Sequence, residues 1–147
     1  MKSFISLIVI LIAALLVSGM GGMFGEDVPA RIPVPDQNFV ATVVDQADVQ
    51  TKLTQFSIDG YTVFFGRLGK GDLAVPFDKI ERADFRLSNS VLEVQLQLKG
   101  GKKLLISADK AKECYGLTEY GNFKITLGNI KMLTIHSQIV DKGKQAQ

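Results

Sequence analysis

The sequence predicts an all-β protein. We expect two tandem copies of about five short antiparallel strands, packed as one sandwich or barrel and preceded by an N-terminal hydrophobic export helix. Three observations support this fold class. Apolar residues alternate with a period of two, glycine-rich turns separate the alternating stretches, and no stretch after the N-terminal segment sustains a helical period. One pattern of glycines and apolar residues also recurs at an offset of 50 residues, which predicts an internal repeat.

Residues 1–25 are typical of a signal peptide. Lys2 supplies a positive start, residues 4–17 form an apolar run broken only by Ser6, and small residues follow. This order predicts export to the periplasm or out of a bacterial cell. The alternative is an uncleaved anchor in the inner membrane over residues 4–24.

The remaining chain divides by composition. Residues 26–37 hold three prolines and predict an extended spacer. Residues 38–140 are expected to form a single β domain of two repeats, at about 39–88 and 89–138. Residues 141–147 form a polar tail.

The two repeats share residue types as well as positions. Each contains a strand that alternates apolar and polar residues, preceded by two glycines and followed by a turn into another strand. The matched pairs are Gly66 and Gly116, Gly71 and Gly121, Leu73 and Phe123, Val75 and Ile125, Phe77 and Leu127, Ile80 and Ile130, and Phe85 and Ile135. The second copy is therefore expected to cover the apolar face of the first.

Glycine and proline mark the turns between the strands. Asp59 with Gly60, and Gly100 with Gly101, predict tight hairpins. Pro76 lacks a backbone donor, so its strand should be an edge strand or end there.

Four glycines of the repeat receive a structural role. Gly66, Gly71, Gly116 and Gly121 mark loops that need a positive φ or a close backbone approach. For Gly71 and Gly121 we expect a positive φ at both.

The repeated unit has the form Gly-x4-Gly-x-(Leu/Phe)-x-(Val/Ile)-x-(Phe/Leu)-x2-Ile. It runs from Gly66 to Ile80 and again from Gly116 to Ile130. It resembles units in uncharacterised exported bacterial β-repeat proteins. The resemblance implies a compartment and a fold type, and it implies no activity.

Charge and cysteine content exclude several classes. The formal net charge is +2, and Lys2 belongs to the export segment, so the exported chain is close to neutral. The densest basic run, residues 100–103, falls in a predicted turn, so nucleic acid is not an expected partner. Cys114 is the only cysteine, which excludes an internal disulfide and favours a small buried apolar role.

The sequence presents little catalytic chemistry. His136 is the only histidine and is expected on the solvent face of a strand, so no metal or cofactor is predicted. We therefore expect a non-enzymatic exported β module that binds or scaffolds an envelope protein or polymer, with the membrane contacted only through an uncleaved N-terminal segment. An enzyme that uses carboxylate residues is the alternative. The candidate binding residues, on the two glycine loops, are Arg67, Lys70, Tyr115 and Tyr120.

Overall fold

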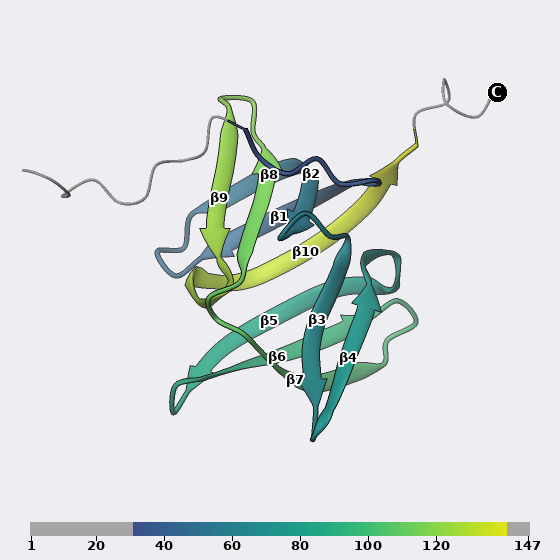
Figure 1. Ribbon diagram of the computed structural model, residues 1–147, viewed down its shortest axis with the longest axis vertical. Coiled ribbons are helices and arrows are strands. Elements are labelled where there is room, and N and C mark those ends of the chain that lie inside the picture. The colour runs from purple at the N-terminus through teal and green to yellow at the C-terminus, as the bar shows by residue number, and fades with distance from the viewer. Residues whose placement is uncertain (1–30, 141–147) are drawn as a thin grey trace, which may run out of the picture.

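The structure is a computed structural model and describes residues 31–140 (Figure 1). It is all-β, and its paired strands run antiparallel. Its elements in chain order are β1 (Asn38–Asp45), β2 (Gln50–Ile58), β3 (Val63–Leu68), β4 (Gly71–Pro76), the short 3-10 turn η1 (Phe77–Lys79), β5 (Ile80–Ser88), β6 (Val91–Leu98), β7 (Lys103–Ala108), β8 (Glu113–Leu117), β9 (Asn122–Thr126), the 3-10 turn η2 (Leu127–Asn129) and β10 (Ile130–Ile139).

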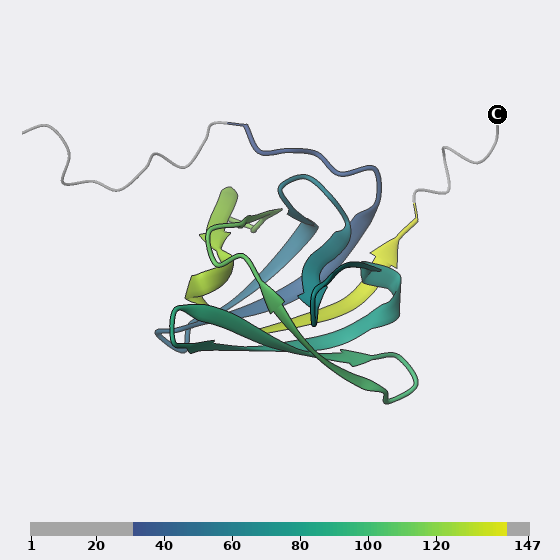
Figure 2. The same ribbon diagram turned by 60° about the horizontal axis from the view of Figure 1, so that its bottom comes forward.

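The ten strands form one curled sheet. Their order is β4-β3-β7-β6-β5-β10-β1-β2-β8-β9, so β4 and β9 are its two edges. The curl brings the β3–β4 and β8–β9 hairpins across the concave face of the other strands (Figures 1 and 2). The sheet is open, so it is neither the closed barrel nor the two-sheet sandwich that the sequence left as alternatives. The predicted position of Pro76 is confirmed, because it is the last residue of the edge strand β4.

The strand order is symmetric between the two halves of the chain. If β1–β5 are exchanged one by one with β6–β10 and the sheet is then read from its other edge, the same order results. The central pair is β5 and β10. The β3–β4 hairpin pairs with β7, at Arg67 and Ser107, while the β8–β9 hairpin pairs with β2, at Leu117 and Thr54. Each hairpin therefore joins strands from the other half of the chain instead of its own half.

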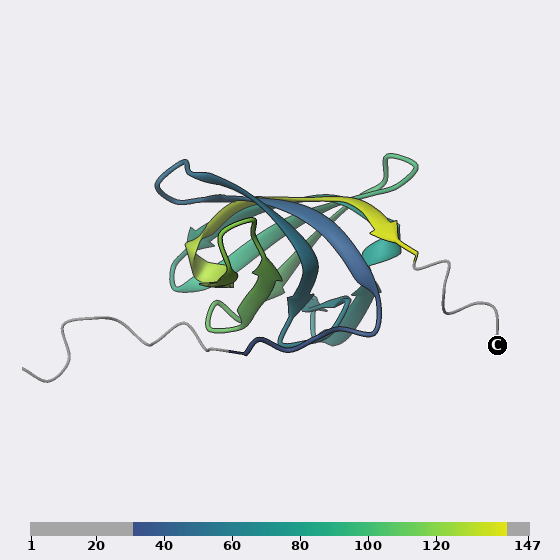
Figure 3. The ribbon, with the colours of Figure 1, turned by 90° about the horizontal axis from the view of Figure 1, so that it is seen from above.

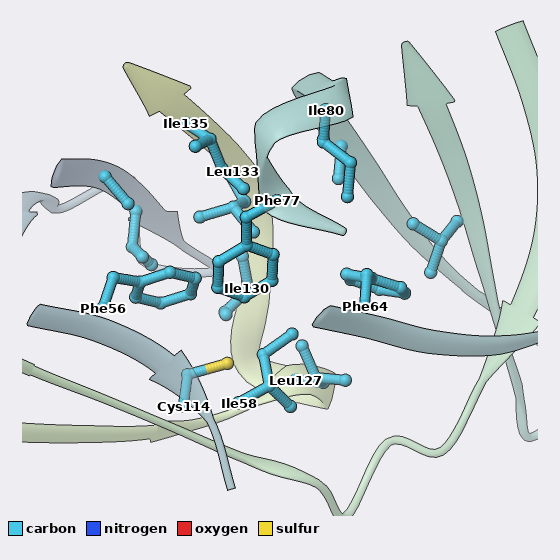
Figure 4. Packing of buried hydrophobic residues seen from close by; sticks show 14 of the residues in the cluster. Phe56, Ile58, Phe64, Phe77, Ile80, Cys114, Leu127, Ile130, Leu133 and Ile135 are labelled. Atoms are coloured by element: carbon cyan, nitrogen blue, oxygen red, sulfur yellow. The ribbon is translucent and has the colours of Figure 1, made fainter. Parts of the chain in front are cut away.

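Apolar side chains of the concave face form the core (Figure 4). Phe77, from η1, is fully buried and contacts two other rings, with centroids 5.6 Å from Phe39 and 5.4 Å from Phe56. Full burial of such a side chain stabilises the fold by about 1.5–3 kcal/mol. The two 3-10 turns insert corresponding residues, Phe77 and Leu127, into this core. The sheet is thus held in its curl by side chains from both halves.

Two of the repeated glycines lie where a hairpin crosses the other half. A Cβ on Gly66 would lie 2.7 Å from Cδ1 of Ile106 and 2.8 Å from the carbonyl oxygen of Ser107, both on β7. A Cβ on Gly116 would lie 2.8 Å from Cβ of Leu53, on β2. Real Cβ atoms do not approach this closely, so Gly66 and Gly116 are required by the close approach that the sequence predicted.

Both predicted tight turns are present. Asp59 and Gly60 have φ of 51° and 86°, and Gly100 and Gly101 have φ of 96° and 93°. The backbone amides of Ile58 and Tyr61 each donate to the carbonyl of the other across the first turn. Positive φ at both central residues is the requirement of a type I′ turn, which Asp-Gly meets at low cost.

The prediction for Gly71 is wrong. Its φ is not positive, and a Cβ there would have only the carbonyl oxygen of Leu68 within 4 Å, at 3.7 Å. The turn consists of Gly69 and Lys70, because Leu68 already pairs with Gly71, and Gly69 has the positive φ of 62°. Gly121 does have a positive φ, of 146°. The two loops therefore differ in length and in the glycine that each requires.

Part of the expected spacer lies against the sheet. Residues 31–37 have no regular secondary structure, yet Cβ of Pro33 lies 3.0 Å from the Cβ position of Gly60, and the hydroxyl of Thr62 donates to Oε1 of Gln37 at 3.3 Å. The predicted signal peptide, the start of the spacer at residues 26–30 and the tail at residues 141–147 lie outside the described residues. Within residues 31–140 there is no helix with the length and apolar character needed to span a membrane.

Candidate functional site

The four predicted binding residues do not form one surface. Arg67 and Lys70 belong to the β3–β4 hairpin at one edge of the sheet, and Tyr115 and Tyr120 belong to the β8–β9 hairpin at the other. Figure 1 shows the tips of these hairpins at opposite ends of the molecule. Any shared ligand would have to be as large as the domain, so the two hairpins are considered separately.

Arg67 is held within its own hairpin. Its Nη2 donates to the carbonyl of Lys70 at 3.2 Å, and its Nε lies 3.6 Å from Oδ1 of Asp72. Both side chains of this ion pair are largely exposed, so solvent screens it and its contribution to stability is small. Lys70 lies exposed at the tip.

Tyr115 takes part in a network on the convex face of β8 and β9. Its hydroxyl donates to Oε2 of Glu113, and Nζ of Lys124 lies 3.4 Å from Oε1 of the same carboxylate. The hydrogen bond to Glu113 and, secondarily, burial raise the pKa of Tyr115 to about 12. The same hydrogen bond, opposed by desolvation and aided by Lys124, lowers the pKa of Glu113. The hydroxyl of Tyr115 is therefore engaged in stabilising the hairpin.

Tyr120 lines a hollow on the described surface. This groove has a volume of about 980 Å³ and lies between β2 and the tip of the β8–β9 hairpin. Its apolar lining consists of Val49, Leu117, Tyr120 and Phe123. Tyr120 is 90% exposed and Val49 is 55% exposed, so both present apolar surface to solvent.

On each side of the groove a turn is held in place by local hydrogen bonds. Oδ1 of Asp45 accepts the backbone amides of Ala47 and Val49, at 2.8 and 3.0 Å, which closes the β1–β2 turn. On the other wall, Oγ1 of Thr118 accepts the backbone amides of Tyr120 and Gly121, both at 3.0 Å. These local bonds are typical of Asx and Ser/Thr turns, and they position the two exposed apolar side chains.

The polar lining of the groove is mostly uncharged. Gln50, Thr51, Thr54 and Thr118 contribute amide and hydroxyl groups, and Lys52 and Glu119 contribute one charge of each sign. A hydrogen bond to Glu119 raises the pKa of Tyr120. The groove therefore suits a partner with apolar groups and little net charge.

One wall of the groove is also a strand edge. The pairing between β2 and β8 includes Thr54 and Leu117 but does not extend to residues 50–53 of β2. Those residues pair with β1 on one side, and no described strand pairs with them on the other. Backbone donors and acceptors on an unpaired edge can accept a further strand.

Two smaller hollows are present on the described surface. One, of about 460 Å³, lies beside Phe65 and Val91. The other, of about 420 Å³, includes the acidic residues Asp84 and Glu93. Asp84 is ion-paired with Arg82 at 2.7 Å, and Glu93 with Arg86 at 2.8 Å, so each carboxylate already has an arginine partner.

The remaining candidate groups lie apart from the groove. Cys114 is fully buried, as predicted, and burial with a smaller effect of Asp59 raises the pKa of its thiol. His136 is exposed, as predicted, with Nε2 2.7 Å from Oγ1 of Thr42. Residues 31–140 contain no cluster of three or more His, Cys, Asp or Glu side chains suited to a metal ion.

Sequence reasoning named Tyr120 as a candidate binding residue, but it did not name the other residues that line the groove. Val49 is the one signal that could have been used, because it is an apolar residue in an otherwise polar turn. β2 and β8 lie side by side because strands that are far apart in the sequence pair with each other. Local residue patterns do not predict such long-range pairing.

These features define a class of protein, a small all-β domain with an open sheet and a mostly apolar groove at a strand edge. Residues 35–138 match the protein family described as "Uncharacterised protein", and the chain belongs to that family. No curated protein and no solved structure matches the chain.

Proposed function

We propose that the protein is an exported, non-catalytic β module that binds an envelope partner in the groove between β2 and the β8–β9 hairpin. The observation that supports it best is the combination of exposed apolar side chains with an unpaired strand edge in one hollow. Its volume of about 980 Å³ lies at the upper end of the range usual for ligand sites. Export is supported by the layout of residues 1–25.

The partner that fits this groove is a polypeptide segment in an extended conformation. Its backbone would pair with residues 50–53 of β2, and alternate side chains would meet Val49, Leu117 and Tyr120. Addition of a strand to an exposed edge is a common mode of peptide recognition, in which the backbone supplies affinity and the pockets supply specificity. Of an envelope protein and an envelope polymer, this geometry favours the protein.

We also infer that the chain consists of two copies of one five-stranded unit. Replacing each strand by its counterpart reverses the strand order, so the sheet reads the same from its other edge. The turns η1 and η2 also begin 50 residues apart, at Phe77 and Leu127. The pairing of Phe64 with Val75 in β3–β4 has its counterpart in that of Cys114 with Ile125 in β8–β9. No comparable observation supports the alternative of a carboxylate enzyme.

The binding proposal can be tested by photocrosslinking in the producing cells. A photoreactive amino acid replaces Tyr120 in the full chain, and the matched control places it at Leu105, which is 64% exposed on β7 away from the groove. We expect a protein adduct from position 120 that is absent from position 105. Equal adducts at both positions, or none at position 120, would contradict the proposal, and an adduct to a non-protein polymer would contradict the extended peptide.

A further inference from the structure

The convex faces of the two edge hairpins carry opposite chemistry at corresponding positions. On β8–β9 the outward residues include Glu113, Tyr115 and Lys124, which form the polar network described above. The residues 50 positions earlier, on β3–β4, are Val63, Phe65 and Ala74. Phe65 pairs with Ala74, as Tyr115 pairs with Lys124. The backbone is alike, but only one hairpin has an apolar outer face.

This outer face of β3–β4 is open to solvent and extends beyond the hairpin. Phe65 is 42% exposed and Tyr61 is 60% exposed, and their rings meet edge to face with centroids 5.7 Å apart. Val91, at the start of β6, is 49% exposed and lines a hollow of about 460 Å³ together with Phe65. The projecting side chain of Tyr61 thus contacts Phe65, which lines a hollow together with Val91, Leu92 and several polar and charged residues.

The charges around this face are balanced. Three cations, Arg67, Lys110 and Lys112, and three carboxylates, Asp59, Asp72 and Asp109, lie around Phe65 and its hollow. An anionic membrane or a nucleic acid would favour an excess of cations. Arg67 is paired with Asp72 and Lys112 with Asp59 within the chain, so a partner surface without net charge is a better match, and the same face of another copy is such a surface.

We propose that this face, defined by Tyr61, Phe65, Val91 and the hollow beside them, binds the same face of a second copy of the chain. In a two-fold interface each contact is made twice, with residue i of one copy against residue j of the other. Tyr61 of each copy enters the hollow beside Phe65 of the other, and the charged residues around it, which include the ion pairs of Arg67 with Asp72 and of Lys112 with Asp59, form the polar rim of the interface. Aromatic anchors in pockets surrounded by polar groups are the usual source of binding energy in such interfaces.

The interface leaves the groove free. The groove is formed by β2, β8 and β9, at the sheet edge opposite to β3 and β4. The inference is therefore independent of the proposed function, and either can fail without the other.

Sedimentation equilibrium of the full chain as isolated from the producing cells tests the interface, in detergent if the N-terminal segment is retained. We expect a monomer–dimer equilibrium between micromolar and millimolar concentrations, and a shift of at least tenfold toward monomer in Phe65→Glu. Tyr61→Glu provides a second variant if Phe65→Glu does not fold. The matched control is Tyr120→Glu, which changes an exposed tyrosine on the groove side and should dimerise like the wild type.

Two results would overturn the proposal. One is a wild-type protein that stays monomeric throughout the range. The other is dimerisation that is unchanged by both Phe65→Glu and Tyr61→Glu. If the monomer instead binds vesicles of anionic lipid through Phe65, the face is a membrane surface and self-association is wrong.

Discussion

At the scale of single residues, Cys114 shows how burial turns a reactive group into a packing group. The side chain has no exposed surface, and burial holds the pKa of the thiol above its ordinary value of 9.0. The thiol is therefore protonated in the folded state at pH values where an exposed cysteine would be a thiolate. Because the thiolate is the nucleophile, Cys114 is inert while the protein is folded.

Burial of Cys114 predicts a pH dependence of stability. Above about pH 9 the thiol of the unfolded chain loses its proton while the folded thiol keeps it, so the free energy of unfolding falls as the pH rises, by at most about 1.4 kcal/mol per pH unit. Below that pH both states keep the proton and the effect is absent. Urea unfolding between about pH 8 and about pH 10 should show a smaller loss of stability in Cys114→Ala than in the wild type.

The matched control is Tyr115→Phe. The pKa of Tyr115 is raised from 10.0 to about 12, so its own contribution begins to be lost only above about pH 10, whereas that of Cys114 begins to be lost above about pH 9. Tyr115→Phe should keep the wild-type slope at the lower end of the range. An unchanged slope in Cys114→Ala would show that the thiol does not control this transition.

Residue-level patterns predicted burial well and backbone conformation less well. Alternation of apolar and polar residues placed His136 at the surface, because a strand has a strict period of two. The general preference of a single free cysteine for the interior placed Cys114 in the core. The repeat marked Gly66 and Gly116 as required. It did not distinguish a glycine needed for its φ from one that only follows a turn, and Gly71 is of the second kind.

At the scale of elements, the β3–β4 hairpin depends on Gly69. Its turn has two residues, Gly69 and Lys70, and only Gly69 has a positive φ. This is the pattern of a type II′ turn, which takes glycine at the first central position. The sequence around Lys70 contains glycine on both sides, so the register of the turn was ambiguous from the sequence.

This geometry predicts unequal effects of two similar substitutions. Gly69→Ala should lower the free energy of unfolding by about 1–3 kcal/mol, because alanine disfavours the positive φ. Gly71→Ala, two residues away, should be neutral or stabilise by up to about 1 kcal/mol, because its φ is ordinary and the space around it is open. Urea midpoints of the two variants, with Lys70→Ala as a further control, measure the difference. The assignment of the turn is wrong if Gly71→Ala is the more damaged protein.

Local chemistry also explains which elements were predictable. Two turns were predictable from their residues, Asp59 with Gly60 and Gly100 with Gly101. Pro76 likewise predicted the end of an edge strand. Alternation of apolar and polar residues predicts the strands themselves. It does not predict which strands pair with each other, because a hairpin with one apolar face can pack on either half of the chain.

At the scale of the whole molecule, the exchange of hairpins makes the two halves interdependent. Within the first half the strand ladders are β1–β2 and β3–β4, and β5 has no partner there. The contacts of β1 and β5 with β10, of β5 with β6, of β2 with β8 and of β3 with β7 all join the two halves. This arrangement reduces the free surface of each half and also creates the groove, since β2 and β8 come from different halves.

The groove and the apolar face of β3–β4 lie at opposite edges of this shared sheet. If both proposals hold, a dimer through β3–β4 presents two grooves to the envelope. Two linked sites bind a partner with repeated segments more tightly than one, because the second contact is made at a high effective concentration. Figure 3 shows the curl of the sheet from above.

The last prediction concerns the interdependence of the halves. The β5–β6 turn contains Asn89 and Ser90, both exposed, so a chain break there removes no core contact. Residues 31–89 and residues 90–140, produced separately, should each fail to fold as a monomer, because β5 and β10 lose their neighbours and the hairpins lose the strands on which they pack. Mixed in equal amounts, the two fragments should recover the far-UV circular dichroism of the intact domain and the protection of Cys114 from alkylation.

The outcome distinguishes an exchanged arrangement from two independently folded units. A fragment that folds as a stable monomer would contradict it, because the pairing across the halves would then be dispensable. A fragment that folds only as a homodimer would agree with it and would add support for duplication. In that dimer, each copy would supply the strands that the missing half supplies in the intact chain, which requires the two halves to be interchangeable in their pairing.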